Sequence, residues 1–351
     1  MRYIGNKTKL LPFIESAFNK YHSDLSELVL CDLFAGTCSV SSHFKTKFGH
    51  VISNDLEDYS LALAKNYICN DGAPEGYQRL IDHMNALPLK SGRLSSNFSP
   101  EGGDRKFFTT NNAQKIQAIR EEIEKLAEHE VVYNFLLCSL LESADACSNT
   151  TGVYGAYLKK FNARSEQGLV LKPYLPNPGS GTALQGDAVK VVKDLSGDVL
   201  YLDPPYNTRK YSSNYHVLNC IVNHRDFEIK QVQKTVKTVD ESTGDVSEER
   251  IFKESVSGLT TDMNNSAFSS KTTVREALEE LIENSSGFST VFLSYNDEGI
   301  LSIEDVREIL SRHGEYELLE KQHKRYKSNT KSDEKQNKQV RELLHVLRRA
   351  K

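Results

Sequence analysis

The sequence predicts an α/β fold that is interrupted by a mainly helical insertion. Short apolar runs of strand length alternate with helix-like segments over residues 1–75 and 182–351, as in a single sheet with connecting helices. Residues 76–181 have a different pattern, because Ile116, Ile119 and Ile123 recur at helical spacing there. The 351 residues are enough for one large core or for two domains.

The first predicted strand is the apolar run of residues 27–34. It ends in Ala35-Gly36-Thr37-Cys38-Ser39, and a helix-like stretch over residues 40–48 follows. A strand, a tight glycine turn and a helix N-terminus together allow the backbone to approach a ligand closely. The sequence therefore predicts a ligand-binding loop around Gly36.

A second predicted strand, residues 50–55, ends in an acid. Asp55 comes 19 residues after Gly36, close to the roughly 20-residue spacing at which a carboxylate meets ribose hydroxyls in nucleotide-binding folds. In the alternative interpretation, Asp32 and Asp55 only cap the helices that follow them.

The insertion is predicted to contain at least two helices. The isoleucine pattern indicates one of them, and residues 131–141 indicate a second, mostly apolar helix. Residues 150–160 then combine glycine, tyrosine and lysine, a composition suited to phosphates and base edges.

The most informative stretch follows the apolar run of residues 198–202. It is Asp203-Pro204-Pro205-Tyr206, in which the two prolines must end the strand. A carboxylate, an unclaimed carbonyl and an aromatic face then lie together at a strand end, where ligands bind in open parallel sheets. That combination suits the binding of a planar amine. In the alternative interpretation, Tyr206 covers the core and Asp203 is a cap.

Later segments complete the predicted sheet. Residues 230–256 alternate Val, Thr, Lys and Glu and suggest a hairpin, and residues 290–295 resemble a strand. Ser302-Ile-Glu-Asp305 can form a capping box that opens a helix. Residues 315–320 and 340–347 then suggest a terminal antiparallel pair.

Composition excludes several classes of protein. No apolar run approaches the roughly 20 residues that span a bilayer, and residues 1–5 lack the apolar region of a signal peptide, so a cytoplasmic protein without a membrane partner is expected. The six cysteines show no C-x-x-C spacing, so neither a metal site nor a disulfide framework is expected, and reduced core cysteines are. The net charge of −4 argues against a uniformly basic nucleic-acid binder but leaves room for a local basic patch.

Three sequence blocks together resemble the D12 class of adenine-N6 DNA methyltransferases, which includes Dam-like enzymes and type II and type IIS modification methylases. Residues 2–11, Arg-Tyr-Ile-Gly-Asn-Lys-Thr-Lys-Leu-Leu, look like the opening motif of that class. Residues 32–36, Asp-Leu-Phe-Ala-Gly, look like its cofactor loop, and residues 203–206 match its catalytic tetrapeptide. Cys38 departs from the pattern, because many relatives have a second glycine there.

The resemblance implies an S-adenosylmethionine-dependent methyltransferase sheet of the Rossmann-like kind. Residues 1–75 and 182–351 would form the catalytic domain, residues 76–181 the target-recognition insertion and residues 230–256 a surface hairpin. The implied catalytic residues are Asp203, Pro204, Pro205 and Tyr206. The implied cofactor-binding residues are Tyr3, Gly5, Lys7, Phe34, Ala35, Gly36, Asp55, Asp187 and Asp203.

Several of these residues have specific expected roles. Tyr3 and Lys7 would line the cofactor pocket, and Phe34 and Gly36 would lie against the methionine and ribose portions. Asp55 would accept from the ribose, and Asp187 would lie near the cofactor adenine. The expected DNA-contacting residues are Tyr154, Lys159, Lys160, Arg209, Lys210, Tyr211, Lys271 and Arg325. Arg325 belongs to a basic stretch, residues 323–331, for which a solvated hairpin tip is the alternative interpretation.

The expected reaction is methyl transfer from S-adenosylmethionine to N6 of a flipped adenine in double-stranded DNA. A modification enzyme of a restriction-modification system is expected, active as a monomer, with a cognate restriction endonuclease as a candidate partner. Two alternatives stay open: a non-catalytic DNA-binding protein on a methyltransferase fold, and an enzyme acting on the cytosine amine, on RNA or on a glutamine amide.

Overall fold

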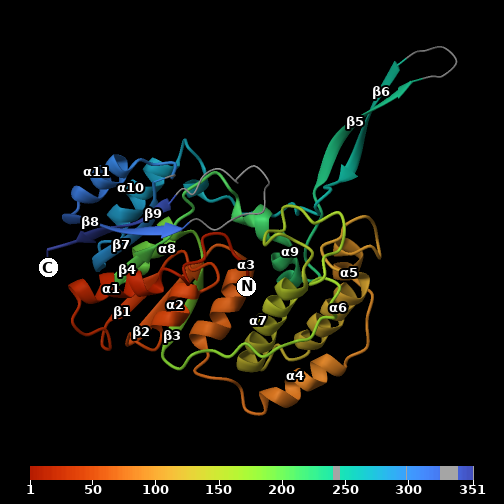
Figure 1. Cartoon of the computed structure of the whole chain (residues 1–351), viewed down its shortest axis with the longest axis horizontal. Coiled ribbons are helices and arrows are strands. Elements are labelled where there is room, and N and C mark those ends of the chain that lie inside the picture. Colours follow the sequence, from red (N-terminus) through yellow and green to blue (C-terminus); the bar gives the residue numbers. More distant parts are fainter. Residues whose placement is uncertain (240–245, 298, 325–338, 351) are drawn as a thin grey trace.

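The computed structural model describes residues 1–239, 246–297, 299–324 and 339–350. Seven strands form one mixed sheet in the order β3-β2-β1-β4-β7-β9-β8 (Figure 1). The pairs from β3 to β7 are parallel, and β9 is antiparallel to both of its neighbours. The strands are β1 Val29–Asp32, β2 His50–Asp55, β3 Gly181–Gln185, β4 Gly197–Leu202, β7 Phe288–Asn296, β8 Glu315–Lys324 and β9 Gln339–Arg348.

Strands β1 and β4 lie at the centre of the sheet because both of their faces are covered. Val199 and Tyr201 belong to one buried apolar cluster, and Leu200 and Leu202 belong to another on the opposite face. Asp32 is in register with Tyr201 in the parallel pair. The loops that follow the two strands therefore leave the same edge of the sheet, although about 170 residues separate them in the sequence.

Helices pack on both faces of the sheet. The second cluster joins the inner strands to helices whose apolar residues recur at helical spacing, such as Leu278, Leu281 and Ile282. The helices and helical turns around the sheet are α1 Leu11–Tyr21, α2 Ser39–Phe44, α3 Asp58–Ala64, η1 Lys65–Cys69, α8 Ala188–Val191, η2 Val192–Asp194, η3 Ala267–Ser269, α10 Val274–Asn284 and α11 Ile303–Ser311. The expected capping box of α11 is present, with Ser302 and Asp305 bonded reciprocally.

The predicted insertion begins with four helices, α4 Tyr77–Ala86, α5 Arg93–Phe98, α6 Thr110–Glu124 and α7 Glu130–Cys147. Residues 148–180 follow without a helix or strand. The insertion shares one apolar cluster with the sheet, because Phe135 and Leu140 belong to the same cluster as Phe44 and Tyr201. Its separation as a domain therefore stays a prediction.

A two-stranded sheet projects from the body as an arm (Figure 1). It follows α9 Tyr211–Asn223 and consists of β5 Gln231–Val239 and β6 Val246–Glu254, paired antiparallel. At its base the Ser255 N–H donates to the Lys230 carbonyl oxygen at 2.8 Å. A hairpin was expected at residues 230–256.

Some details differ from expectation. The helix after the glycine loop ends at Phe44 rather than near Phe48, and turn hydrogen bonds continue the chain. Five cysteines are buried as expected, but Cys69, the last residue of the π-helical turn that follows α3, is exposed. Among the described helices, none is long and apolar enough to cross a membrane.

Candidate active site

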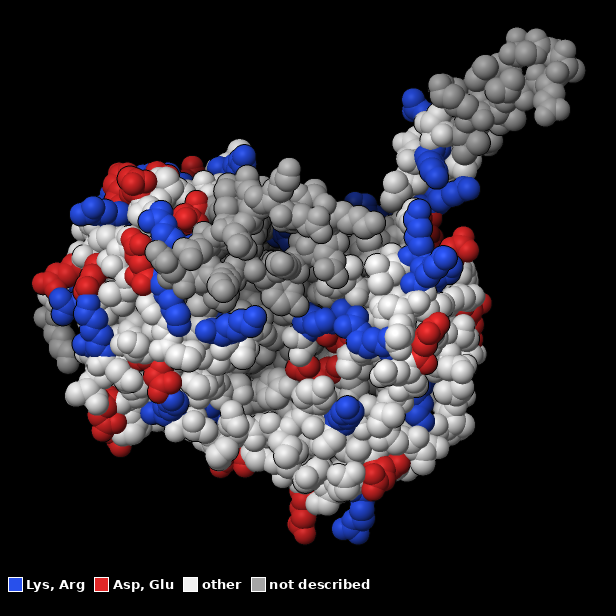
Figure 2. Space-filling view, in the orientation of Figure 1, with Lys and Arg blue, Asp and Glu red and all other residues white. Residues whose placement is uncertain are grey.

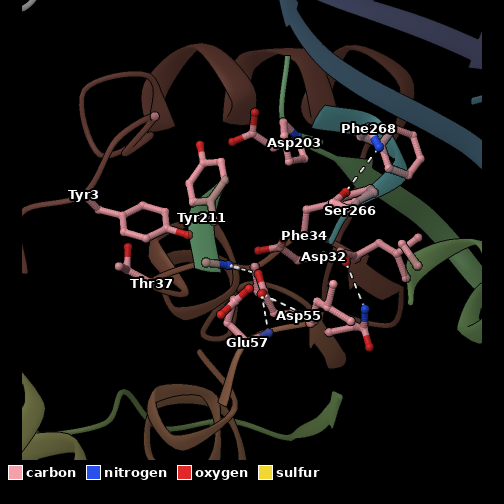
Figure 3. Close-up of a pocket in the computed structure, with 18 of the residues that line it drawn as sticks. Tyr3, Asp32, Phe34, Thr37, Asp55, Glu57, Asp203, Tyr211, Ser266 and Phe268 are labelled. Atoms are coloured by element: carbon pink, nitrogen blue, oxygen red, sulfur yellow. Dashed lines mark hydrogen bonds between the residues drawn. The ribbon is translucent and has the colours of Figure 1, made fainter. Parts of the chain in front are cut away.

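A pocket opens at the carboxyl ends of β1, β2 and β4 and encloses about 950 Å³ when its open mouth is included. All nine expected cofactor-binding residues line it. Figure 3 shows Asp203 at one end and Asp55 and Glu57 at the other, with Tyr3 and Tyr211 on one wall and Ser266 and Phe268 opposite. The pocket is therefore elongated, and acids lie at both of its ends.

The loop after β1 turns tightly against the N-terminal segment. Gly36 has a φ of +53°, and a Cβ at this position would lie 2.8 Å from Cε1 of Tyr3. The Ala35 N–H donates to the Asn54 carbonyl oxygen at 2.9 Å, which ties the loop to the end of β2. Only glycine combines this φ with so close an approach of the Tyr3 ring.

Cys38 replaces the expected second glycine of the loop and keeps the backbone conformation that a glycine would adopt. Its φ is 58°, and it is the only described non-glycine residue with a positive φ. This left-handed conformation favours glycine, which is the residue expected there. The thiol is fully buried and lies 4.0 Å from the Ser53 hydroxyl, so the side chain fits within the core.

Asp32 both supports α2 and faces the pocket. Its Oδ2 accepts from the Ser41 hydroxyl at 2.5 Å and from the Ser41 N–H at 3.2 Å, so the capping interpretation is correct in part. Its Oδ1 is buried and, within the described part of the chain, has no hydrogen-bond partner. Burial raises the pKa of Asp32 to about 7. A buried unpaired oxygen of this kind suits a cationic ligand group.

At the end of the pocket opposite Asp203, Asp55 is held in place by backbone amides. Its Oδ2 accepts from the Gly36 N–H at 2.8 Å, and its Oδ1 accepts from the N–H groups of Leu56 and Glu57 at 2.8 and 3.0 Å. Burial nevertheless raises its pKa. The carboxylate is held in one orientation beside the glycine loop.

Glu57 is a second acid at this end that sequence reasoning missed. It is 4% exposed, and its Oε2 accepts from the Asn219 amide of α9 at 2.7 Å. Burial raises its pKa to about 8. The run Asp55-Leu-Glu57-Asp58 contains three acids, and a position two residues after a strand end was the available signal.

Asp203 forms an ion pair with Lys7. The Lys7 ammonium lies 2.9 Å from Asp203 Oδ1 and is only 4% exposed. Burial lowers the pKa of Lys7, but the charge and hydrogen bond of Asp203 together with the charges of Glu342 and Tyr206 outweigh burial and raise it overall. Burial also raises the pKa of Asp203, against the attraction of Lys7. The opening block and the catalytic tetrapeptide are thus in direct contact.

The rest of the tetrapeptide surrounds this pair. The Tyr206 ring packs edge-on against Tyr295 at a centroid distance of 6.2 Å, and the Lys7 ammonium lies 5.9 Å from the Tyr206 centroid. Pro205 lines the pocket, and Pro204 is buried.

The expected DNA-contacting residues are in different places. Lys159, Lys160, Arg209, Lys210 and Lys271 are exposed, and Figure 2 shows Lys and Arg side chains gathered across the middle of one face and at the base of the arm. Of these five, Lys210 also lines the pocket and donates to the Asn265 side chain at 2.9 Å.

Two other expected DNA-contacting residues, Tyr154 and Tyr211, do not lie on the exposed basic surface. The expectation for Tyr154 is wrong, because its side chain is fully buried and donates to Asp145 at 3.2 Å. Tyr211 lies in the pocket wall, with its ring centroid 5.4 Å from that of Tyr3. Arg325 lies outside the described residues.

The family model of the D12 class of N6 adenine-specific DNA methyltransferases matches residues 3–326. The chain belongs to this class. Type II methyltransferase M.NlaIII of Neisseria lactamica is 38% identical over 99% of both chains, and type II methyltransferase M.CviAII of Paramecium bursaria Chlorella virus 1 is 33% identical over 93% and 92% of the two chains. Modification methylase StsI of Streptococcus sanguinis is 34% identical over 99% of this chain but 52% of its own length.

As a D12-class enzyme, the protein is a site-specific adenine-N6 DNA methyltransferase of the type II restriction-modification kind. Its mixed α/β sheet is a methyltransferase fold, and S-adenosylmethionine is the methyl donor of the class. The pocket fits such a donor, which carries an ammonium and a sulfonium. Five acids line the pocket, and one buried oxygen of Asp32 has no partner in the described chain.

Proposed function

We propose that this D12-class enzyme methylates N6 of an adenine that has been flipped out of duplex DNA, and that Asp203 and Tyr206 hold the base. One observation carries this proposal: the Asp203 carboxylate lines the same pocket as the glycine loop after β1. The two loops leave neighbouring strands in register, so an acceptor at one and a donor at the other can meet in line.

In this proposal the cofactor lies along the pocket. Asp55, held by three backbone amides, accepts from the ribose hydroxyls at one end. Asp32 Oδ1 accepts from the ammonium group, and Phe34 and Gly36 lie against the methionine and ribose portions. Asp187, which also caps α8 by accepting from the Val189 N–H at 3.0 Å, lies near the adenine. Bound S-adenosylmethionine supplies an electrophilic methyl group.

The exocyclic amine of adenine is a poor nucleophile because its lone pair is delocalised into the ring. Asp203 and the Pro204 carbonyl accept its two N–H bonds, which favours a more pyramidal nitrogen that faces the methyl group. Positioning and electrostatics then supply most of the acceleration, and no covalent enzyme intermediate is needed. The amine becomes acidic as it attacks, so its proton leaves late, to Asp203 or to water.

Before the target base enters, the Lys7 ammonium occupies the acceptor that the target amine will use. Its ammonium donates to the same carboxylate that accepts from adenine N6, and it also lies beside the Tyr206 ring. Entry of the base therefore exchanges one N–H donor at Asp203 for another. Stacking of the base on Tyr206 contributes about 1–3 kcal/mol, which offsets part of the cost of unstacking.

The exposed lysines and Arg209 contact phosphates around the target, and the enzyme acts as a monomer beside a cognate restriction endonuclease. Phosphate contacts of this kind make DNA affinity fall with rising salt. The Lys and Arg side chains that gather across the middle of one face and at the base of the arm in Figure 2 support such phosphate contacts.

Two variants in the same pocket test the proposal. Asp203→Ala should lower the methylation rate by at least about a hundredfold, the loss typical of removing a group that stabilises the transition state, and should leave cofactor affinity within a few fold. Asp187→Ala is the matched control: it should weaken cofactor binding and keep the rate at saturating cofactor. Sequencing of methylated adenines in cellular DNA gives the recognition sequence for the assay. Normal turnover by Asp203→Ala would sink the proposal.

Base flipping has its own measurement. A duplex with 2-aminopurine at the target position becomes more fluorescent when the base leaves the stack. The fluorescence should rise on binding to the wild type and to Tyr206→Phe, and rise less with Tyr206→Ala. An unchanged signal with the wild type would contradict flipping.

A further inference from the structure

Arg2 fixes the start of the chain to the helical insertion. Its Nη2 donates to the Asp145 carbonyl oxygen at 3.0 Å, to Asp145 Oδ1 at 3.1 Å and to the Ser148 hydroxyl at 2.7 Å. Its Nη1 donates to the Thr150 carbonyl oxygen at 2.9 Å, and its backbone N–H donates to Asp145 Oδ2 at 2.8 Å. Residue 2 is therefore held through both its side chain and its main chain.

Asp145 is an unfavourable residue for its own helix. It lies near the C-terminus of α7, where the helix dipole disfavours a carboxylate, and it is only 2% exposed. A buried carboxylate needs compensation from charged and hydrogen-bonding partners. Arg2 supplies the charge, and the Tyr154 hydroxyl donates at 3.2 Å. The role of the acid is thus its contact with Arg2 rather than helix stability.

The next residue forms a wall of the cofactor pocket. The Tyr3 ring lies against Gly36 and stacks on Tyr215 with centroids 4.7 Å apart, and its hydroxyl bonds with that of Tyr59 at 2.9 Å. The Ile4 N–H donates to the Tyr215 hydroxyl at 2.8 Å. Three consecutive residues therefore join the insertion, the cofactor loop and α9.

The insertion loop that binds Arg2 also contacts α9. The Tyr154 N–H donates to the Asn214 carbonyl oxygen at 2.6 Å, one residue before α9 leaves helical geometry at Tyr215. The turn that contains Asn214 begins with Tyr211, which lines the pocket. Farther along the same loop, Lys159 and Lys160 are exposed. A change in the position of this loop can therefore act on two walls of the pocket, on Tyr3 through Arg2 and on Tyr211 through the first turn of α9.

We infer that Arg2 is a positioning residue that couples DNA docking on residues 148–160 to the fit of Tyr3 over the cofactor. This inference rests on the proposed function and adds a mechanism of cooperation to it. DNA bound to the loop holds Asp145 and Arg2 more firmly, and through them it holds Tyr3 against the cofactor. The target duplex therefore tightens cofactor binding. By linkage, the cofactor tightens DNA binding by the same factor.

The test measures the dissociation constant of S-adenosylhomocysteine, which cannot transfer a methyl group, with and without a short duplex that carries the mapped recognition sequence. In the wild type the duplex should lower that constant about fivefold or more, the range of ordinary coupling between sites. Arg2→Lys keeps the charge but loses the planar fork, and it should reduce the effect to less than about twofold. Asp145→Asn should do the same with little change of shape.

Arg164→Lys is the matched control. Arg164 donates to the Ser148 and Thr150 carbonyl oxygens, at 3.1 Å each, so this variant weakens the same loop and keeps the contact between Arg2 and Asp145. The coupling should survive in it. The inference would be overturned if the wild type showed no coupling, or if Arg2→Lys and Asp145→Asn kept the wild-type coupling. It would also be overturned if Arg164→Lys lost as much coupling as these two variants. Methyl transfer by the wild-type preparation separates this failure from failure of the proposed function.

Discussion

Four acidic side chains, Asp32, Asp55, Glu57 and Asp203, share one pocket, and burial raises the pKa of each. The pKa values of about 7 for Asp32 and about 8 for Glu57 mean that these two carboxyls hold protons near neutral pH, and a bound cation would displace the protons because it favours the ionised carboxylates. The unfolded chain ionises Asp32 near pH 3.8, whereas the folded protein keeps the proton to about pH 7. Ionising Asp32 therefore destabilises the ligand-free protein across that window.

Cofactor affinity should rise with pH through the range near 7. Below about pH 7 Asp32 is protonated and offers no charge to the ammonium group; above it the carboxylate is ionised and binds. Calorimetry in two buffers of different ionisation enthalpy should detect proton release on S-adenosylmethionine binding at pH 7. Asp32→Asn should weaken binding and flatten the pH dependence. A wild-type affinity that is constant from pH 6 to 8 would contradict this account.

Lys7 should discriminate against the charged form of the cofactor. Its ammonium and the sulfonium of S-adenosylmethionine repel each other, whereas S-adenosylhomocysteine has a neutral sulfur. Lys7→Met should shift the ratio of the two dissociation constants toward S-adenosylmethionine by about three- to tenfold, as expected for two charges at short range in a partly buried site. Lys7→Arg is the control that keeps the charge and the ratio. Because a ratio is compared, partial unfolding of a variant does not affect the result.

At the scale of elements, the loop between β1 and α2 is shaped by two left-handed residues, Gly36 and Cys38. Gly36 lies against the ring of Tyr3, while Cys38 is buried beside Ser53. The same loop thus contributes to stability and to binding, and the two contributions can be separated by substitution.

Gly36→Ala should weaken cofactor binding by about tenfold or more, because its Cβ would lie 2.8 Å from Tyr3 and its φ is +53°. Gly72→Ala provides the control, since Gly72 has a φ of +108° and no neighbour within 4 Å of an added Cβ. Both variants should lose about 1–2 kcal/mol of stability from the left-handed backbone. Only Gly36→Ala should impair binding, as measured by titration calorimetry; equal binding by the two variants would exclude the crowding argument.

The sequence predicted local features of the site better than its contacts. The strand end at Leu202 follows from an apolar run that two prolines stop, and β2 begins and ends at the predicted residues. Strand β1 ends at Asp32, two residues before the predicted end of its apolar run. The pairing of Lys7 with Asp203 depends on sheet order, which a single sequence does not contain. Tyr154 was misjudged because its ring packs against Phe107 and Tyr215, which are distant in the sequence.

At the scale of the whole molecule, the sheet order brings together loops that are distant in sequence, and the arm lies outside that arrangement. Strands β5 and β6 pair only with each other among the described strands. Phe252 is 70% exposed, so the arm buries little apolar surface. An isolated two-stranded sheet is marginally stable and adds little to the stability of the body.

Removal of the arm should leave the fold intact. Lys230 and Ser255 are already joined by a backbone hydrogen bond of 2.8 Å, so a short glycine linker can replace residues 231–254 without strain. The thermal midpoint should change by less than about 2 °C, because about 1 kcal/mol shifts it by only about 1–2 °C in a chain of this length. A larger drop in scanning calorimetry would mean that the arm supports the body.

The contact between Arg2 and Asp145 has a consequence for recombination between relatives. A chimera that takes its insertion from one parent and its first residues from another separates the two halves of this contact. An acid left buried without its guanidinium costs about 3–5 kcal/mol, a large part of the stability of an ordinary domain. Viable exchanges of specificity should therefore inherit positions 2 and 145 from the same parent.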